Sequence, residues 1–268
     1  MGLHLAYKKA KGGRMGRIVR YISEKKFERF KKDIAFLVDK IKKSNGELDL
    51  QLREDYFNIY YKGNSLAKVN VRAKDYEIII HRKFRLSKAI DKDPLKRFSP
   101  DKIKPSGKEN ESYVIEPALL HPFFQEAVIN VLLSEIKKVN NGEEIAFEQS
   151  LMTDNLGRED LIIIDRQVQW TGSPGKLDLL ALNKVPNGIY KFVVLEVKLG
   201  NNPELCDDVA YQLNRYVEAI KLNIQEFKKC YELNYKQKKD LGLFPDTFPK
   251  TISISEEVTG KIVVGFYS

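Results

Sequence analysis

Three charged residues stand in the most apolar part of this 268-residue sequence: Asp178, Glu196 and Lys198. The run Leu-Leu-Ala-Leu follows Asp178, and the run Phe-Val-Val-Leu leads directly into Glu196-Val-Lys198. A charged group in an apolar setting costs free energy unless a partner or a ligand compensates it. Two carboxylates and one ammonium in such places therefore indicate a site that uses their charge.

The pattern around these residues predicts two paired strands. In residues 192–199 side chains alternate, so that Val193, Leu195 and Val197 point one way while Glu196 and Lys198 point the other. The preceding strand, residues 176–182, is joined to it by a turn that contains Pro-Asn-Gly, a hairpin signal. Because the strands of a hairpin are antiparallel, the start of the first lies beside the end of the second. This arrangement places Asp178 next to Glu196 and Lys198.

Two carboxylates at close range repel each other unless a cation joins them. Mg²⁺ is the natural candidate, because it is a hard ion that prefers oxygen ligands and keeps several waters. Mn²⁺, which suits the same ligands, is expected to substitute for it. A metal held by Asp178 and Glu196 would polarise a phosphodiester and lower the pKa of a bound water. Lys198 would position that water or offset the charge that develops on the phosphate.

The constellation of Asp178 with Glu196-Val-Lys198 resembles the PD-(D/E)XK nuclease superfamily, which has the restriction-endonuclease-like fold. Leu177 stands where many members carry a proline, a minor departure. Residues 175–181 and 194–200 are similar to the NucS/EndoMS-type branch, and Gln212-Leu-Asn-Arg-Tyr216 resembles the Gln-x-x-x-Tyr element of RecB-type nucleases. The resemblance covers about residues 115–225 and implies metal-dependent cleavage of phosphodiester bonds.

The same resemblance implies two further catalytic residues. Gln212 would hold the attacking water or a phosphate oxygen, although an ordinary half-buried amide also explains it. Superfamily members often place a glutamate from the first helix near the metal, and residues 117–138 read as that helix. Glu126 is favoured because the first half of the helix should approach the active-site end of the sheet. Glu135, nearer the apolar stripe, and His121 are the alternatives.

The distribution of charge indicates a nucleic-acid partner. Residues 1–110 hold 29 Lys and Arg against 14 Asp and Glu, whereas residues 111–268 hold 17 against 23. A basic half joined to an acidic half suits an enzyme that holds a polyanion with one part and cuts it with the other. The family branch with similar motifs often acts as a dimer on duplex DNA, so the resemblance implies DNA as the partner and a homodimer as one option.

The predicted fold class is α/β: a restriction-endonuclease-like mixed sheet flanked by helices, preceded by a small α+β domain. Residues 1–17 are expected to be a basic arm. A helix over 18–44 and a β-meander over 48–86 form the basic α+β domain, residues 1–110, which ends in a proline-containing linker over 91–112. The nuclease domain, residues 111–268, is expected to continue with a strand over 161–170, a helix over 207–226 and a parallel strand over 261–268.

Composition excludes several other classes. No run of about 18 apolar residues suggests a membrane span, and the N-terminus lacks the apolar core of a secretory signal, so a cytoplasmic protein is expected. Cys206 and Cys230 have no metal-ligand spacing, and the three histidines are scattered. Two rival hypotheses remain open: a catalytically inactive nucleic-acid-binding or assembly module on the same fold, and a protein-interaction domain.

Overall fold

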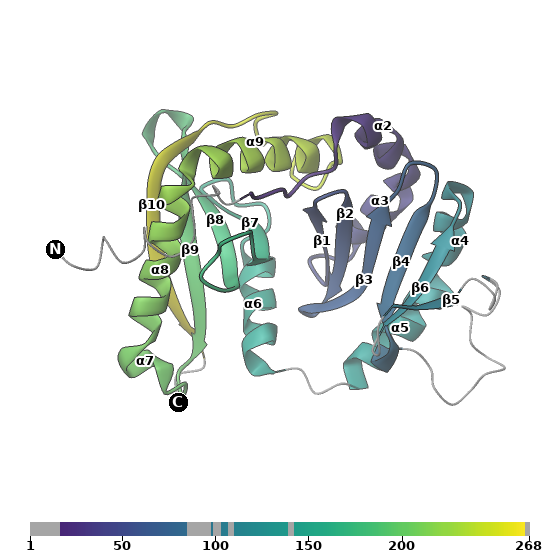
Figure 1. Ribbon diagram of the computed structural model, residues 1–268, viewed down its shortest axis with the longest axis horizontal. Helices are drawn as coiled ribbons and strands as arrows, with labels where there is room; N and C mark the ends of the chain where they lie inside the picture. The colour runs from purple at the N-terminus through teal and green to yellow at the C-terminus, as the bar shows by residue number, and fades with distance from the viewer. Residues whose placement is uncertain (1–16, 85–97, 99–102, 107–109, 139–141, 266–268) are drawn as a thin grey trace.

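A computed structural model describes residues 17–84, 98, 103–106, 110–138 and 142–265, apart from the side chains of residues 103–106 and of Asp207. The expected basic arm therefore lies almost entirely outside the described residues. The protein is mixed α/β, with two sheets side by side (Figure 1). The first sheet has the strand order β1-β2-β3-β4-β6-β5, and the second has the order β10-β9-β8-β7.

The first sheet is antiparallel throughout and confirms the expected meander. Its strands are β1 (Leu48–Arg53), β2 (Tyr56–Tyr61), β3 (Asn64–Val71), β4 (Tyr76–His81), β5 (Ile103–Ser106) and β6 (Asn110–Ile115). Buried and half-buried residues alternate strictly along β4, because one face of the sheet is packed and the other is not. The tight turn between β2 and β3 has Lys62 and Gly63 at φ of 46° and 79°.

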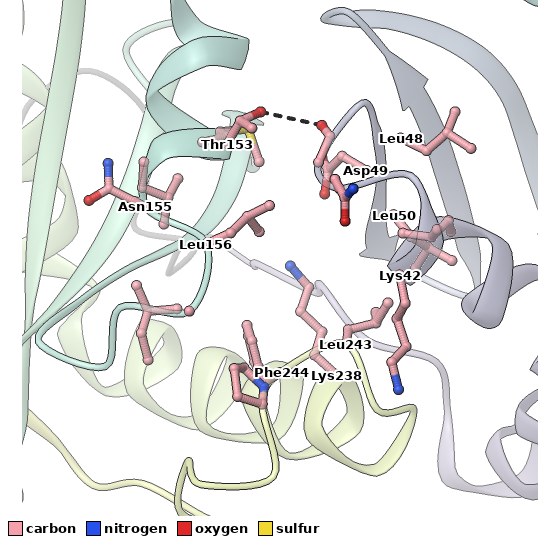
Figure 2. A pocket seen from close by; sticks show the side chains of 18 of the residues that line it. Lys42, Leu48, Asp49, Leu50, Thr153, Asn155, Leu156, Lys238, Leu243 and Phe244 are labelled. Atoms are coloured by element: carbon pink, nitrogen blue, oxygen red, sulfur yellow. Dashed lines mark hydrogen bonds between the residues drawn. The ribbon is translucent and has the colours of Figure 1, made fainter.

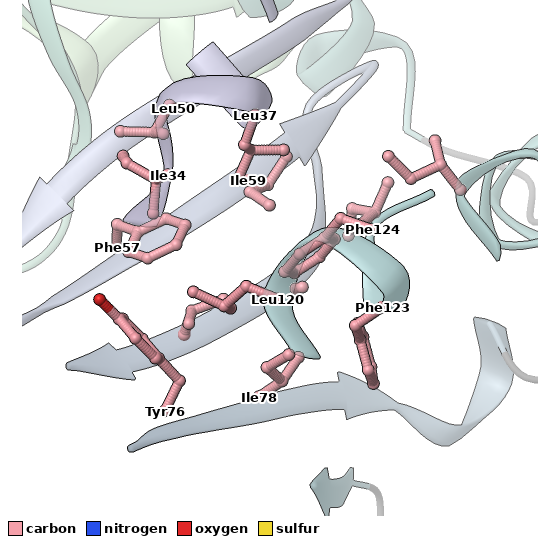
Figure 3. Packing of buried hydrophobic residues seen from close by; sticks show 14 of the residues in the cluster. Ile34, Leu37, Leu50, Phe57, Ile59, Tyr76, Ile78, Leu120, Phe123 and Phe124 are labelled. Carbon is pink, nitrogen blue, oxygen red and sulfur yellow. The ribbon is translucent and has the colours of Figure 1, made fainter. Parts of the chain in front are cut away.

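Helices cover one face of this sheet. They are α2 (Glu24–Asp33), α3 (Ala35–Lys43), the short α4 (Leu120–Phe123) and α5 (Glu126–Lys138). The single helix expected over 18–44 is divided at Ile34, whose φ of −103° and ψ of 5° leave the helical range. Figure 3 shows the result: Phe57 of the sheet lies beside Ile34, Ile78 lies near Leu120 and Phe123, and all belong to one core.

The predicted division of the chain at residue 110 is wrong. Strand β6 pairs with β4 of the first sheet, and the apolar stripe of the helix expected over 117–138 is buried in the first core. The first unit therefore extends to Lys138, and the second starts with the helix after it. An apolar stripe tells that a helix is buried on one side, but it does not tell which sheet the helix covers. Much of the expected linker lies outside the described residues.

The second sheet is mixed. Its strands are β7 (Leu161–Val168), β8 (Leu177–Lys184), β9 (Tyr190–Leu199) and β10 (Ile254–Gly265). Strands β7, β8 and β9 are antiparallel, and β10 is parallel to β9. The hairpin turn between β8 and β9 contains Asn187 at a φ of 73°, a conformation that asparagine tolerates well. The parallel last strand is confirmed, although it begins at Ile254 rather than at residue 261.

Helices lie on both faces of the second sheet. Helix α6 (Glu143–Asp154) packs on one face, where Met152 and Phe147 join a core of Leu179, Val193 and Val197. The other face is covered by α8 (Val209–Leu222) and α9 (Ile224–Asp240), with the short α7 (Glu204–Asp207) before them. The sequence assigned no element to the lysine-rich stretch that forms most of α9. None of the helices in the described part of the chain is long and apolar enough to cross a membrane.

Buried polar contacts join the two units. Arg53 of β1 pairs with Asp165 of β7 at 2.7 Å and donates to the backbone oxygen of Arg166 at 2.9 Å. Helix α9 runs across from the second sheet towards the first (Figure 1). Its Gln237 accepts a hydrogen bond from the backbone N–H of Ile22 at 2.9 Å. The Arg53 contacts hold β1 beside β7.

Candidate active site

The β8–β9 hairpin brings Asp178, Glu196 and Lys198 together at one end of the second sheet. Leu179 lies opposite Leu195 in the register, so Asp178 is level with Glu196. The carboxylate of Asp178 accepts a hydrogen bond of 3.0 Å from the backbone N–H of Val197, between the other two residues. The juxtaposition expected from the hairpin pattern is therefore present.

Lys198 is held by two carboxylates. Its ammonium lies 3.2 Å from Glu196 Oε1 and 2.8 Å from Glu204 Oε2, and the Lys198 side chain is almost entirely buried. Burial alone would lower the pKa of Lys198, but the bonds to Glu204 and Glu196 outweigh it and raise the pKa. Lys198 is therefore an ammonium at neutral pH. It can offset negative charge and donate hydrogen bonds, but it cannot accept a proton there.

Glu196 is buried and only partly compensated. Its Oε1 faces Lys198, whereas its Oε2 is buried without any hydrogen-bond partner. Burial and then the charge of Asp178 raise the pKa of Glu196 to about 7. Burial likewise raises the pKa of Asp178. A buried carboxylate oxygen without a donor, next to a second carboxylate, is a position that a cation would stabilise.

Helix α6 adds two glutamates that sequence reasoning missed. The charge of Glu144 helps to raise the pKa of both Asp178 and Glu196, so Glu144 lies within electrostatic range of both. Glu148, one turn later on the same side of the helix, is buried and has a pKa of about 7. Burial is the main cause, and Asp178 adds to it while Arg166 opposes it.

Two side chains of β7 hold the carboxylate of Glu148 in place. Gln167 donates to both of its oxygens, at 3.1 and 3.0 Å, and Arg166 lies 3.2 Å from Oε2. Gln167 has a φ of 51°, which interrupts the regular strand. Glu144 and Glu148 are four residues apart and precede the first strand of the second sheet. This spacing, which puts two carboxylates on one side of a helix, was the sequence signal that could have revealed them.

The upstream residues proposed from the sequence lie elsewhere. Glu126 is the exposed first residue of α5, a helix that packs on the first sheet. On the same helix, Glu135 pairs with Lys138 at 2.6 Å. The ring of His121 packs against Phe36 with centroids 4.7 Å apart. The assignment of Glu126 is thus wrong in its premise, because the helix that carries it does not cover the second sheet.

Gln212 approaches the site through Tyr216. The Tyr216 hydroxyl donates to the backbone oxygen of Lys176 at 3.0 Å and is hydrogen-bonded to the Gln212 side chain. Burial, with the nearby charges of Glu196 and Asp178, raises the pKa of Tyr216. A Cβ on Gly175 would lie 2.6 Å from this hydroxyl, so the glycine makes room for it. Gln212 and Tyr216, the two residues of α8 that the sequence associates with the site, therefore lie beside the carboxylates.

The donor set fits a hard divalent cation. Asp178 and Glu196 supply carboxylate oxygens, one of which lacks a partner, and Mg²⁺ is commonly held by one or two carboxylates with waters and phosphate completing its shell. Within the described ranges, no group of three or more His, Cys, Asp or Glu side chains is arranged to hold a metal. A cation here would thus depend on water and substrate for much of its coordination.

No family model, no curated protein and no solved structure matches this chain. The function must be argued from the geometry of the site. That geometry consists of two carboxylates on adjacent strands, two more on α6, and an ammonium held between Glu196 and Glu204.

Proposed function

We propose that this protein is a metal-dependent nuclease of the restriction-endonuclease-like type that hydrolyses phosphodiester bonds, acting as an endonuclease on DNA. One observation carries the proposal. The buried Glu196 has an oxygen without a hydrogen-bond partner, and it lies beside Asp178 with the Lys198 ammonium 3.2 Å from its other oxygen. A carboxylate pair with a fixed cation at the end of a sheet is suited to bind a divalent metal and a phosphate together.

Each residue then has a distinct task. Asp178 and Glu196 would hold Mg²⁺, or Mn²⁺ in its place, which supplies a polarised phosphate and a more acidic bound water. Lys198 offsets the negative charge that grows on the phosphate during attack, because the two glutamates beside it keep it protonated. Glu148 is a further carboxylate close to Asp178, fixed by Gln167. Gln212 orients the Tyr216 hydroxyl beside these groups.

A polar hollow next to the site supports a nucleic-acid substrate. Its volume is about 500 Å³, and both units line it, with Arg17, Arg20 and Arg53 among the lining residues. Gln167 lines the same hollow and donates to Glu148, so the hollow adjoins the candidate active site. Arginine forks suit phosphate oxygens, and about half or more of the hydrogen bonds that proteins make to DNA go to phosphate and sugar.

The uncovered face of the first sheet continues this surface. Tyr56 and Asn58 of β2 line the 500 Å³ hollow and also a second one of about 300 Å³. The ammonium of Lys68 lies 4.1 Å from the centroid of the Tyr56 ring. Aromatic rings and cations of this kind suit contact with bases and phosphates.

Cleavage of a mixed panel tests the proposal. The panel holds supercoiled plasmid, linear duplex, single strands, branched or mismatched duplexes and RNA, each with Mg²⁺, Mn²⁺ or EDTA. Lys198→Ala is compared with Lys191→Ala, which changes a lysine at the other end of the same strand, paired with Glu257. We expect cutting that needs metal, is lost in Lys198→Ala and persists in Lys191→Ala.

Two results would reject the nuclease proposal. Metal-dependent cutting that survives Lys198→Ala would place the activity elsewhere or in a contaminant. Binding of nucleic acid that weakens steeply with salt, with no cutting on any substrate, would favour the non-catalytic binding module on the same fold.

A further inference from the structure

A further pocket lies between the two units, away from the candidate active site. Its volume is about 440 Å³. The first unit contributes the end of α3 and most of β1, and the second contributes the last turns of α6, the start of β7 and the end of α9. Small-molecule sites commonly have this size and commonly lie where two units meet. We refer to it as the inter-sheet pocket.

Apolar side chains form part of the walls of the inter-sheet pocket, among polar and charged ones. Leu50 and Leu156 face each other across it, and Phe244 lies at its lower edge (Figure 2). Leu156 is 58% exposed, an unusual state for a large apolar side chain at the rim of a hollow. A flat apolar body placed between these side chains would remove their surface from water, which is favourable in proportion to the apolar area covered.

One buried cation of the inter-sheet pocket, Lys238, has no carboxylate partner among the described contacts. Asp49 also lines the pocket, but it is hydrogen-bonded by the Gln51 amide rather than by Lys238. Arg20 and Arg53 line the 500 Å³ hollow instead and share the buried Asp165. Asp165 pairs with Arg53 at 2.7 Å and with Arg20 at 3.6 Å. Lys238 bonds only to neutral oxygens, those of the Gln51 side chain and the Ile164 backbone. A buried cation without a carboxylate partner is costly, and an anion nearby would offset that cost.

Lys238 is the cation that a ligand can reach. Its side chain rises from α9 into the middle of the inter-sheet pocket, between Leu156 on one side and Asp49 and Leu50 on the other (Figure 2). Burial lowers the pKa of Lys238 to about 8, which agrees with an ammonium that lacks a carboxylate partner. Lys42, an exposed residue near the end of α3, adds a second lysine to the lining.

We propose that the inter-sheet pocket binds a small organic anion: a molecule with a flat apolar body and one acidic group, such as a carboxylate, sulfonate or phosphate. The apolar body lies against Leu50, Leu156 and Phe244, and the acidic group accepts a hydrogen bond from Lys238. This site is separate from the proposed nuclease centre and does not depend on its activity. Gln149 lines the pocket and also accepts a bond of 2.7 Å from Arg166, which pairs with Glu148, so this side chain connects the pocket with the candidate active site.

Fluorescence titration of the full chain in EDTA tests the proposal. The probe is 8-anilinonaphthalene-1-sulfonate, a flat apolar anion, and its comparison is N-phenyl-1-naphthylamine, which keeps the rings and lacks the acid. We expect saturable binding of the anion at one site, about tenfold or more tighter than binding of the neutral compound. Lys238→Met should remove most of that difference while leaving the neutral compound bound.

Matched variants separate this site from general surface binding. Leu156→Ser and Lys42→Ala should each weaken binding of the anion several-fold, because both residues line the pocket. Leu222→Ser changes a leucine of similar exposure, 63%, on α8, and Lys43→Ala changes the next, equally exposed lysine of α3; neither residue lines the pocket, so neither should have an effect. Both lining variants change exposed side chains and should leave the fold intact.

Several outcomes would overturn the proposal. These are equal affinity for the anion and the neutral compound, absence of saturation, or equal effects in the lining variants and their controls. Each would show that the pocket does not select a flat anion. None of these results depends on whether the protein cuts nucleic acid, because no metal is present.

Discussion

The ammonium of Lys198 lies closer to Glu204 than to Glu196, at 2.8 Å against 3.2 Å. Glu204 belongs to the short helix α7, which follows β9, the strand that carries Glu196 and Lys198. The Glu204 side chain is 47% exposed. A residue outside the Glu-x-Lys pair therefore helps to place the ammonium. We expect Glu204→Gln to reduce cleavage roughly fivefold, because a half-exposed hydrogen bond to a charged group contributes about 1 kcal/mol.

The pH profile separates positioning from simple loss of structure. Removal of the Glu204 charge should lower the pKa of Lys198 and move the alkaline limit of cleavage to lower pH. Glu218→Gln is the control, because Glu218 is also half-exposed and pairs with a lysine, Lys221, at 2.9 Å. An unchanged profile in Glu204→Gln would show that Glu196 alone sets the state of Lys198.

Glu148 and Glu126 offer a direct comparison between the structure and the sequence. Glu148 is buried near Asp178, whereas Glu126 is exposed at the start of a helix on the other sheet. We expect Glu148→Gln to reduce cleavage by about a hundredfold or more, the usual effect of removing a working carboxylate. Glu126→Gln should cleave as the wild type does.

Single-turnover cleavage at saturating substrate is the suitable measurement, since it removes differences in binding. Glu148→Gln keeps a similar shape and an acceptor for Gln167, so a loss of rate would reflect the charge rather than the packing. Full activity in Glu148→Gln would exclude Glu148 from the site, and a large loss in Glu126→Gln would restore the assignment made from the sequence.

The sequence was sufficient to predict the hairpin and the residues that meet on it. Strict alternation in β9 and a Pro-Asn-Gly turn determine both the pairing and its approximate register. These are local signals, and local signals are the ones that a sequence expresses most clearly. The parallel pairing of the last strand followed from the helices that precede it.

The sequence was not sufficient to find α6. Its buried face includes Glu148 and Gln149 beside Met152, so the helix lacks the apolar stripe by which buried helices are found. Those polar residues are buried because Arg166 and Gln167 satisfy them, and that partnership spans 17 to 19 residues of chain. The apolar stripe of α5, in contrast, is clear in the sequence, but it does not tell which of the two sheets the helix covers.

Replacement of Glu196 should stabilise the protein while it removes activity. Its pKa in the folded state, about 7, exceeds the ordinary value of 4.5, so the folded state loses stability as the pH rises from about 4.5 through 7. We expect Glu196→Gln to raise the free energy of unfolding at pH 8 by about 1 to 2 kcal/mol, allowing for the lost contact with Lys198. Urea unfolding of the wild type and of Glu196→Gln in EDTA measures this difference in the free energy of unfolding.

The gain from Glu196→Gln should shrink towards zero near pH 4.5, where the wild-type carboxyl group is already protonated. Glu218→Gln, a change on the exposed face of α8, should leave stability the same at both pH values. A loss of stability in Glu196→Gln at pH 8 would mean that its contact with Lys198 outweighs its burial next to Asp178.

Gly175 is a structural requirement of the site. Its added Cβ would lie 2.6 Å from the hydroxyl of Tyr216, far inside normal contact distance, and that hydroxyl is bonded to Gln212 and to the backbone of Lys176. We expect Gly175→Ala to displace Tyr216 and to reduce cleavage at least tenfold with a small drop in melting temperature. Gly142→Ala is the control, because nothing lies within 4 Å of an added Cβ there. Equal activity of the two variants would show that Tyr216 has no part in the site.

Asp165 is a buried carboxylate at the contact between the two units. It pairs with Arg53 at 2.7 Å and accepts from the Tyr231 hydroxyl at 2.9 Å, and all three side chains are buried. Burial raises its pKa, but Arg53 and Arg20 outweigh burial and hold the pKa below its usual 3.8. We expect Asp165→Asn to destabilise the protein by about 3 to 5 kcal/mol at pH 7, because it leaves buried cations unpaired.

The pH dependence distinguishes this cause from a loss of packing. A carboxylate with a lowered pKa contributes stability above about pH 3.8, and that contribution is lost as the pH falls through its folded-state pKa. The difference between wild type and Asp165→Asn should therefore be constant from pH 5 to pH 7 and decrease below 3.8. Asp160→Asn, which changes an exposed aspartate paired with Arg158, should leave stability unchanged. A difference that stays constant down to pH 2 would assign the effect of Asp165→Asn to packing rather than to charge.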